Sequence, residues 1–305
     1  MRLMSASSQR EKAAAPRRVD RLMWVTPDRV FYVGLLGSPT TRIMGSVMLY
    51  VAAEGSIRVR IDGGDWQVTD MAVVPPYTPH EVLSEARLIN VIKVEAETVD
   101  LAVAPELLRQ RGAVAADGFV AHTRKLSEEL RSSRCENLMS VDFDRLLFEQ
   151  TLAPRRIDPR IREVVETIKR NPAAPALAED CAQDVSLSFS RFLHLFKEEV
   201  EIPFRSFRSW KRARGLLCRV NEKSSLTDVA LDSGYPDSSH FSHSIRQVYG
   251  LKPKDIFAGS RRLAVYANGD SAAFSRDRFG AADHACAARP MTGAAAPNGN
   301  PTRLG

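Results

Sequence analysis

The stretch LTDVALDSGYPDSSHFSHSIRQVYGLKPKDIF, residues 226–257, decides how the C-terminal third of this chain folds. Apolar residues recur at helical spacing in its first part, break at Gly234, and resume after Ser238. Gly250 tolerates the left-handed conformation that ends a helix, and Pro253 prevents the helix from continuing. The stretch therefore predicts a helix-turn-helix, in which the first helix holds the second at a fixed angle.

A second helix-turn-helix pattern lies upstream. Residues 176–184 predict a positioning helix and residues 188–200 a recognition helix, which begins at the natural N-cap Ser188. Phe192 and Phe196 supply the inward face of the recognition helix. The chain therefore contains two units of the same kind, both after residue 175.

Both units carry the residues of a known signature in order and spacing. In the second unit these are Ala230, Gly234, Tyr235, Ser239, Phe241, Arg246, Gly250 and Pro253. In the first unit they are Leu177, Ala178, Leu187, Ser188, Phe192, Phe196, Lys197 and Pro203. The chain resembles the AraC-type (AraC/XylS) family of bacterial transcriptional regulators. Two residues depart from the family's pattern, Ser186 at the usual turn glycine and Glu201 at the usual glycine before the proline, so both ends of the first unit are expected to be strained or differently angled.

The resemblance implies that both recognition helices enter major grooves of double-stranded promoter DNA. The outward residues that we expect to read bases are Phe189, Ser190, Leu193, His194, Ser238, Ser239, Ser242 and His243. Phosphate contacts are expected from Arg191, Lys197, Arg246 and Lys252. Because none of the base-reading residues is an arginine suited to guanine, we expect modest intrinsic specificity.

Residues 204–220, between the two units, predict one helix rich in Arg and Lys. About 17 helical residues at 1.5 Å each span roughly 25 Å. This length allows the two recognition helices to stand about 34 Å apart, which is one turn of B-DNA. We expect the basic residues of this helix either to contact the intervening phosphates or to form a solvated face; they are Arg208, Lys211, Arg212 and Arg214.

The overall charge is only mildly basic, at +6 with a pI of about 9.3. Residues 160–262 contain 18 Lys and Arg against 13 Asp and Glu, so most of the excess lies where contact with phosphates is expected. The four cysteines include no Cys-x-x-Cys, which favours reduced thiols. No signal peptide and no run approaching 18 apolar residues is recognisable, so we expect a cytoplasmic protein without a membrane segment.

Residues 21–97 are typical of a β-sandwich or barrel, because short β-branched or alternating runs are separated by turn residues. The predicted strands are 47–51, 56–61, 66–69, 71–74 and 89–94. Asp62-Gly63-Gly64 predicts a tight hairpin turn. This part resembles the cupin-like barrel that many AraC-type proteins carry as an effector and regulatory domain.

Three residues of the barrel are candidates for an effector pocket. Trp66 and Tyr77 either line such a cavity or belong to the core, and His80 is either a structural turn residue or one polar group of the cavity. One imidazole cannot hold a divalent ion, and the strand expected to supply further histidines, residues 44–51, contains none. We therefore expect no metal, no cofactor and no catalytic residue.

Residues 99–153 change to helical periodicity with two apolar stripes. The resemblance implies that these helices form a homodimer, whereas the residues alone are equally compatible with packing against the chain's own barrel. The expected organisation is a disordered basic arm at 1–20, a cupin-like regulatory or dimerisation domain at 21–153, a linker at 154–159, a DNA-binding domain at 160–262 with units at 176–200 and 226–250, and a disordered tail at 263–305.

The fold class expected is α+β, with a cupin-like β-barrel and following helices before an all-α double helix-turn-helix domain. The leading hypothesis is a sequence-specific DNA-binding regulator, an activator that recruits RNA polymerase and senses a small-molecule effector or dimerises through its barrel. The alternatives are a cupin-type metal enzyme with an appended DNA-binding domain and a ligand-independent repressor.

Overall fold

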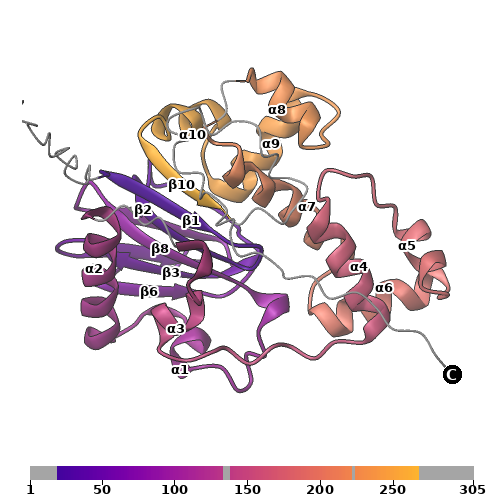
Figure 1. Ribbon diagram of the computed structural model, residues 1–305, viewed down its shortest axis with the longest axis horizontal. Coiled ribbons are helices and arrows are strands. Elements are labelled where there is room, and N and C mark those ends of the chain that lie inside the picture. Colours follow the sequence, from indigo (N-terminus) through magenta and orange to yellow (C-terminus); the bar gives the residue numbers. More distant parts are fainter. Residues whose placement is uncertain (1–18, 133–137, 222–223, 268–305) are drawn as a thin grey trace, which may run out of the picture. The chain divides into compact units, whose positions relative to one another are not determined.

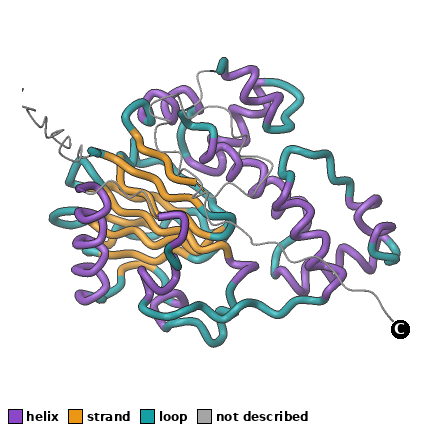
Figure 2. Tube along the Cα trace, in the orientation of Figure 1, coloured by secondary structure: helices purple, strands orange, loops and turns teal. Residues whose placement is uncertain are grey.

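The computed structural model describes residues 19–132, 138–221 and 224–267, whose helices and strands are drawn in Figures 1 and 2. Most of the arm predicted at 1–20 and most of the tail predicted at 263–305 lie outside these ranges. The structure therefore does not describe most of the two segments that were predicted to be disordered. The exception in the tail is a strand at Leu263–Ala267.

Two β-sheets form the N-terminal half. The larger sheet has seven strands in the order β10-β1-β2-β8-β3-β6-β9, and the smaller has three in the order β5-β4-β7. The strands of the larger sheet are β1 (Arg21–Val25), β2 (Arg29–Gly34), β3 (Ser46–Ala52), β6 (Met71–Val74), β8 (Ile89–Glu95), β9 (Gly112–Ala113) and β10 (Leu263–Ala267). Those of the smaller sheet are β4 (Ile57–Ile61), β5 (Gln67–Thr69) and β7 (His80–Ser84). The five strands predicted individually are confirmed to within one residue at either end, whereas β1, β2 and β7 were not singled out.

Both faces of the larger sheet are covered by other parts of the chain. Every residue of β3 and β8 is buried. Along β3, Leu49 belongs to a hydrophobic cluster on one face of the sheet, and its neighbour Met48 belongs to a cluster on the opposite face. Strands that are buried on both faces carry continuous apolar runs rather than strict alternation, and the sequence SVMLYVA of β3 shows this pattern.

Three helices cover the face of the larger sheet that carries Leu49. They are α1 (Glu106–Arg109), α2 (Asp117–Ser132) and α3 (Phe143–Phe148), and Figure 1 shows α2 running across the direction of the strands. Val120, Leu126 and Leu130 of α2 are buried in the same cluster as Leu49. The apolar stripe of α2 therefore packs against the chain's own sheet, and dimerisation through these helices stays a prediction. We call the two sheets with α1–α3 the β-domain.

The first helix-turn-helix unit has a hydrophobic cluster of its own. It follows α4 (Pro159–Arg170), whose predicted N-cap Asp158 accepts a hydrogen bond from the backbone N–H of Arg160. The unit consists of α5 (Ala178–Asp184) and α6 (Phe189–Val200). Buried residues of α4, α5, α6 and the start of the next helix close this cluster, with Phe192 and Phe196 at the centre of several aromatic contacts. These two residues face inward as predicted.

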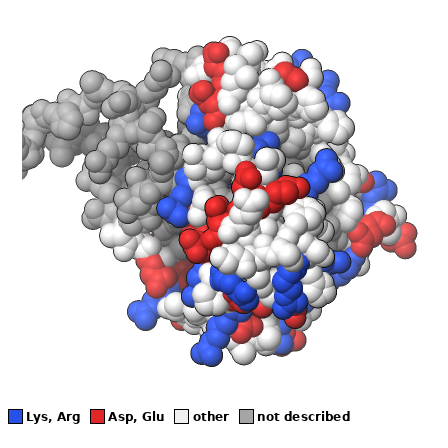
Figure 3. Space-filling view, turned by 90° about the vertical axis from the view of Figure 1, so that its right-hand side faces the viewer, with Lys and Arg blue, Asp and Glu red and all other residues white. Residues whose placement is uncertain are grey.

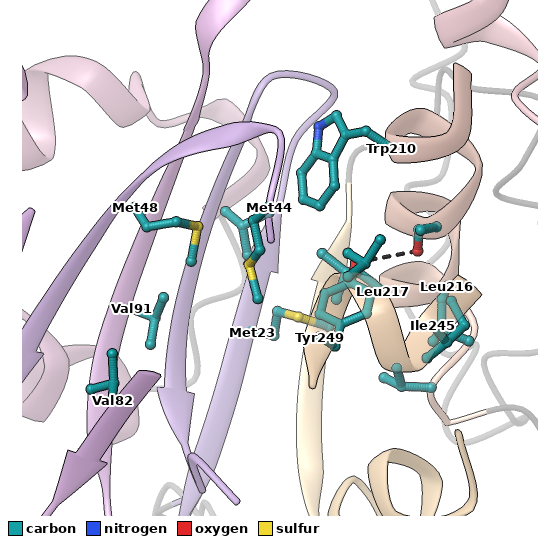
Figure 4. Close-up of a cluster of buried hydrophobic side chains, with 14 of the residues drawn as sticks. Met23, Met44, Met48, Val82, Val91, Trp210, Leu216, Leu217, Ile245 and Tyr249 are labelled. Atoms are coloured by element: carbon teal, nitrogen blue, oxygen red, sulfur yellow. Dashed lines mark hydrogen bonds between the residues drawn. The ribbon is translucent and has the colours of Figure 1, made fainter. Parts of the chain in front are cut away.

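The second unit, in contrast, shares its core with the β-domain. It consists of α8 (Leu226–Asp232) and α9 (Ser238–Tyr249) and is followed by α10 (Pro253–Gly259). Ile245 and Tyr249 of α9 belong to the same buried cluster as Met23, Met48 and Val91 of the larger sheet. Figure 4 shows strand and helix side chains pointing toward one another in this cluster. The second unit is therefore held in place by the β-domain.

The linking helix is shorter than predicted. It is α7 (Phe204–Arg214), followed by the 3-10 helix η3 (Gly215–Cys218), instead of one helix over 204–220. Glycine has low helix propensity because it loses more backbone freedom than other residues, and the change of helix type occurs at Gly215. The spacing of the two recognition helices, which was reasoned from the longer helix, stays a prediction.

The start of the tail is ordered, so the prediction of disorder at 263–305 is wrong for Leu263–Ala267. These residues form β10, which pairs in parallel with β1, in the register Leu263 to Arg21. Its sequence LAVYA is apolar enough to extend the sheet on both faces, where Val265 and Tyr266 pack against opposite clusters. The partner strand lies at the other end of the chain, which is why local composition did not indicate a strand.

Candidate nucleic-acid interface and adjoining cavity

The turn of the second unit requires the glycine that the sequence places there. Gly234 has φ of 76°, and a Cβ atom at this position would lie 2.1 Å from the carbonyl oxygen of Ala173. The helices on either side begin at well-formed caps. Ser225 and Asp228 form a capping box at α8, and Asp237 accepts hydrogen bonds from two backbone N–H groups at the start of α9. The entry of α9 is thus fixed by local interactions.

The outward face of α9 carries most of the residues predicted to read bases. Ser239 and His243 are exposed, and Ser238 and Ser242 are half-buried. The inward residues of the same helix, Phe241 and Ile245, are fully buried. The sequence analysis missed two further exposed polar residues of this helix, His240 and Gln247; the helical spacing that assigned the inward residues would have found both.

The first recognition helix presents a comparable but more apolar face. Ser188 caps α6 as predicted, by accepting a hydrogen bond from the backbone N–H of Arg191 at 3.4 Å. Ser190 and His194 are exposed, and Leu193 is half-buried against the first unit's own cluster. Phe189 exposes 46% of its surface.

The residues predicted to contact phosphates lie on the same helices or close to them. Arg191, Lys197, Arg246 and Lys252 are all exposed. Arg246 lies in the last turn of α9, and Lys252 is the N-cap of α10. Figure 3 shows Lys and Arg interspersed with Asp and Glu on the face it displays, rather than a uniformly basic surface.

Ser186 and Glu201, which replace the family's glycines, both adopt the left-handed conformation that favours glycine, with φ of 54° and 65°. We therefore predict that Ser186→Gly raises the free energy of unfolding by about 0.5–1 kcal/mol, because it relieves this strain. Ser190→Gly is the matched control inside α6 and is expected to lower stability by a similar amount. Urea unfolding of the full chain measures both, and a loss of stability in Ser186→Gly would contradict the strain.

Two of the basic residues predicted to contact phosphates are buried instead. Lys211 and Arg214 of α7 expose only 4% and 8% of their surfaces. The Nζ of Lys211 lies 2.5 Å from Glu95 Oε2, and Nε of Arg214 donates to Glu95 Oε1 at 2.6 Å. Trp210 Nε1 also donates to Glu95, at 2.7 Å. The prediction is therefore wrong for these two residues, which anchor α7 to the end of β8, whereas Arg208 and Arg212 stay half-exposed.

A second carboxylate extends this buried ion cluster. Glu97 Oε1 lies 2.5 Å from Lys211 Nζ. Burial alone would raise the pKa of Glu95, but the ion pairs with Lys211 and Arg214 outweigh it and lower that pKa to about 2. For Glu97, burial and the neighbouring Glu95 outweigh Lys211 and raise the pKa. Glu95 is thus the charged partner of both cations.

A cavity of about 290 Å³ lies beside this cluster, between the β-domain and the second unit. Its walls are mostly apolar and come from β1, β2, β3 and β8 on one side and from η3, α9 and α10 on the other. Met23, Met48 and Val91 belong to the first wall, and Leu216 and Tyr249 belong to the second. The volume is at the lower end of the range of about 300–1,000 Å³ that small-molecule sites occupy.

Two buried cations reach this apolar cavity. Arg42 exposes 3% of its surface, and its Nε and Nη2 have no hydrogen-bond partner among the residues that the structure describes. Lys93 exposes 6%, and its ammonium lies 5.1 Å from the ring centroid of Tyr249. Burial, assisted by Arg214, lowers the pKa of Lys93 to about 7. Glu95 opposes this shift, and the carboxylate of Asp255 also lines the cavity. Buried charges are costly unless they are paired, so the incompletely bonded guanidinium of Arg42 is the group in this wall that an anion would stabilise.

The residues predicted to line an effector pocket lie elsewhere. Trp66 is partly exposed, and Arg60 stacks on its ring at 4.9 Å. Tyr77 packs beside Trp210, and its buried hydroxyl has no hydrogen-bond partner. None of Trp66, Tyr77 and His80 is among the lining residues of the cavity. The predicted position of an effector pocket therefore does not coincide with this cavity.

His80 is a buried structural residue next to the cavity wall. Its Nδ1 lies 2.8 Å from the carbonyl oxygen of Thr78, which makes Nδ1 the donor, so Nε2 accepts from the Tyr50 hydroxyl at 2.7 Å. Burial lowers the pKa of His80 to about 4. His80 thus stays neutral and orients Tyr50, which does line the cavity.

Over 19–132, 138–221 and 224–267, no three His, Cys, Asp or Glu side chains converge in a way that could hold a metal ion. Over the same ranges, none of the helices combines the length and the apolar character needed to cross a membrane.

Comparisons with known proteins agree with this geometry. Residues 181–259 match the family described as "Helix-turn-helix domain". The invasion protein InvF of Salmonella typhimurium is 29% identical over 75 residues, which cover 24% of this chain and 35% of InvF. The match thus spans about a third of this curated relative. ToxT from Vibrio cholerae O395 superposes with a TM-score of 0.51 at 10% identity, over 76% of this chain and 97% of ToxT.

A further ToxT structure, from Vibrio cholerae strain SCE256 with an unsaturated fatty acid bound, has a TM-score of 0.47 at 11% identity, over 76% of this chain and 95% of that one. The likeness to ToxT O395 shows a shared fold, and it confirms the predicted α+β class with a cupin-like β-domain and a double helix-turn-helix domain. The chain carries an AraC-type helix-turn-helix domain, so the family resemblance seen in residues 226–257 is confirmed.

Proposed function

We propose that the chain is a sequence-specific DNA-binding transcriptional regulator that inserts α6 and α9 into consecutive major grooves of promoter DNA. The observation that carries this proposal is that both helices begin at side-chain caps and present exposed polar residues opposite a buried face. Phosphate contacts position such a protein, and groove-facing side chains read the sequence.

A selection from random oligonucleotides, followed by hydroxyl-radical footprinting, tests this proposal. We expect a site with two enriched blocks about 10 base pairs apart. His194→Ala should weaken protection at one block and His243→Ala at the other, each by about 1–3 kcal/mol if the histidine contacts a base. If only one block is enriched and His194→Ala has no effect, α6 does not read sequence.

A phosphate contact gives a different signature from a base contact. Arg246→Ala should weaken binding to all sequences alike and reduce the slope of log K against log salt concentration by about 1. Arg145→Ala is the matched control, because Arg145 is exposed on α3 of the β-domain. A change of sequence preference in Arg246→Ala would show that it reads bases.

We further propose that the cavity binds a small amphipathic anion as effector. Arg42 has two guanidinium nitrogens without a hydrogen-bond partner among the described residues, and Lys93 is a second buried cation. The remaining walls are mostly apolar, although Asp255 also lines the cavity. A ligand that binds only the folded state stabilises it by about 2.7 kcal/mol at a hundredfold excess over its Kd. Decanoate should therefore raise the Tm of the full chain, decanol should raise it much less, and Arg42→Met should abolish the difference. Equal shifts with both probes would mean that the site is purely apolar.

The remaining parts of the proposal rest on the family resemblance. We propose an activator that recruits RNA polymerase in the cytoplasm and forms a homodimer. A ligand-independent repressor is the alternative, and a Tm that decanoate raises would argue against it. In vitro transcription from the selected site, with and without decanoate, decides between activation and repression.

A further inference from the structure

The two helix-turn-helix units are built into the protein in different ways. The first unit closes its own hydrophobic cluster, to which α4, α5, α6 and the start of α7 contribute. The buried residues of α8 and α9 instead belong to the cluster that includes the larger sheet. The position of α9 therefore depends on the β-domain, whereas α6 packs within its own unit.

The cavity touches the second unit and not the first. Tyr249, the last residue of α9, forms part of its wall, and its hydroxyl donates to the carbonyl oxygen of Ala213 at 3.2 Å. Leu216 and Leu217 of η3 extend this wall. No residue of α5 or α6 is among the lining residues of this cavity. A ligand in the cavity would thus lie against the end of the second recognition helix.

The connection between β2 and β3, residues 35–45, joins the cavity to the same helix end. Arg42 and several apolar residues of this connection line the cavity. The backbone N–H of Ile43 donates to the carbonyl oxygen of Val248 at 3.1 Å, and Thr40 Oγ1 donates to that of Gly250 at 2.6 Å. The contact leaves no free space, because a Cβ at Gly250 would lie 2.4 Å from Thr40 Oγ1.

The helix α7 separates the two units mechanically. Its first half, with Phe204 and Phe207, belongs to the first unit's cluster, and its second half, with Trp210 and Ala213, belongs to the shared cluster. Glu95 holds the second half through three hydrogen bonds to α7. The cavity wall lies after this anchored half of α7 in the chain, and the first unit lies before it. A displacement that starts at the cavity wall would therefore move α9 and leave α6 in place.

Resting on the proposed function, we propose that occupation of the cavity changes the pose of α9 alone, so that an effector controls reading by the second unit while the first unit stays bound. The connection at 35–45 and Tyr249 transmit the change. Packed interfaces shift between discrete arrangements rather than deforming continuously. Coupling between two sites commonly changes an affinity by about 5- to 150-fold.

A block-resolved footprint tests this proposal on the selected site. His194→Ala and His243→Ala first assign each block to its unit. Decanoate and the cavity-filling variant Val91→Phe should then each change protection of the second unit's block by about tenfold and leave the first block unaffected. Val91→Ile is the matched control that adds a single methylene. If decanoate does not bind, the footprint of Val91→Phe decides the question. If Val91→Phe does not fold, the footprint with decanoate decides it.

A second pair of variants tests the route of the coupling. Thr40→Val removes the hydrogen bond to Gly250 and should reduce the effect of decanoate on the second block. Thr41→Val removes a hydrogen bond to Glu81 of β7 instead of one to the end of α9, and it should preserve the effect of decanoate. Parallel changes at both blocks, or no change at either while the cavity is filled, would overturn the proposal. Absence of any two-block site would instead overturn the proposed function.

Discussion

Replacement of Glu95 by alanine is expected to lower the free energy of unfolding by about 3–5 kcal/mol, the range found when one partner of a buried ion pair is removed. The carboxylate is fully buried and accepts from Trp210, Lys211 and Arg214. Without it, Arg214 loses its charged partner, and Lys211 keeps only Glu97. Urea unfolding of the full chain near pH 7 measures the loss.

The matched control is Glu129→Ala on α2. Glu129 forms an ion pair with Lys125 at 3.8 Å, and both side chains are largely exposed. Exposed pairs of this kind contribute about 0–1 kcal/mol. Glu95→Gln should fall between the two, because its side-chain oxygen can still accept a hydrogen bond while Arg214 loses its counter-charge and Lys211 keeps Glu97. A loss below about 1 kcal/mol in Glu95→Ala would show that the cations reach water.

The same residue makes a testable contribution to acid stability. The pKa of Glu95 in the folded protein is about 2, below its ordinary value of 4.5. Its stabilising effect is therefore complete above pH 4.5 and is lost as the pH falls toward 2. Glu95→Gln should accordingly flatten the fall in stability over this interval.

The helix-turn-helix units were predictable because their determinants are local. Ser188 and Asp158 cap helices that begin at the next residue, and Gly234 supplies the positive φ that its own turn needs. The individual strands followed from apolar runs in the same way. Even the strain at Ser186 was visible, since a residue other than glycine stood where the family's turn has glycine.

The shared core could not be predicted because its contacts join distant parts of the chain. Glu95 lies at the end of a strand and Lys211 in a helix 116 positions later, and neither position alone indicates the other. One signal was present: Lys211 and Arg214 interrupt the apolar stripe that Phe204, Phe207 and Trp210 begin on α7. A charged residue at an inward position predicts a buried partner, and this inference would have separated them from Arg208.

The predicted effector pocket and the cavity do not coincide, for a related reason. Trp66, Tyr77 and His80 were selected as aromatic or polar residues of the predicted barrel, and they lie outside the cavity. Its cations come from positions that local patterns do not single out. Lys93 lies within a buried strand, where β-branched neighbours conceal its role, and Arg42 lies in a connection without regular structure.

Replacement of Lys93 by methionine is expected to stabilise the empty protein while removing its response to decanoate. The ammonium is buried, and burial with repulsion by Arg214 and Arg42 outweighs the attraction of Glu95, so its pKa in the folded protein is about 7 against an ordinary 10.5. Each pKa unit corresponds to about 1.4 kcal/mol, so a charged Lys93 costs several kcal/mol of stability. Methionine has a similar length and removes that cost.

The sign of the pH dependence follows from proton binding. Between pH 7 and 10.5 the unfolded chain holds a proton on Lys93 that the folded protein lacks, so the wild type gains stability as the pH rises. The advantage of Lys93→Met should therefore be largest below pH 7 and shrink toward pH 9. Lys125→Met, which changes an exposed lysine on α2, should show no such trend.

The two readouts together distinguish a binding site from a flaw of packing. A lysine that merely tolerated burial would stabilise the protein when replaced and leave decanoate binding unchanged. If the lysine is instead kept to bind an anion, its replacement should stabilise the protein and also abolish the Tm shift with decanoate. Unfavourable buried groups persist where function needs them. If Lys93→Met is instead less stable than the wild type at pH 6, the ammonium is already compensated within the protein. The proposal that the cavity binds an anion through Lys93 would then be wrong.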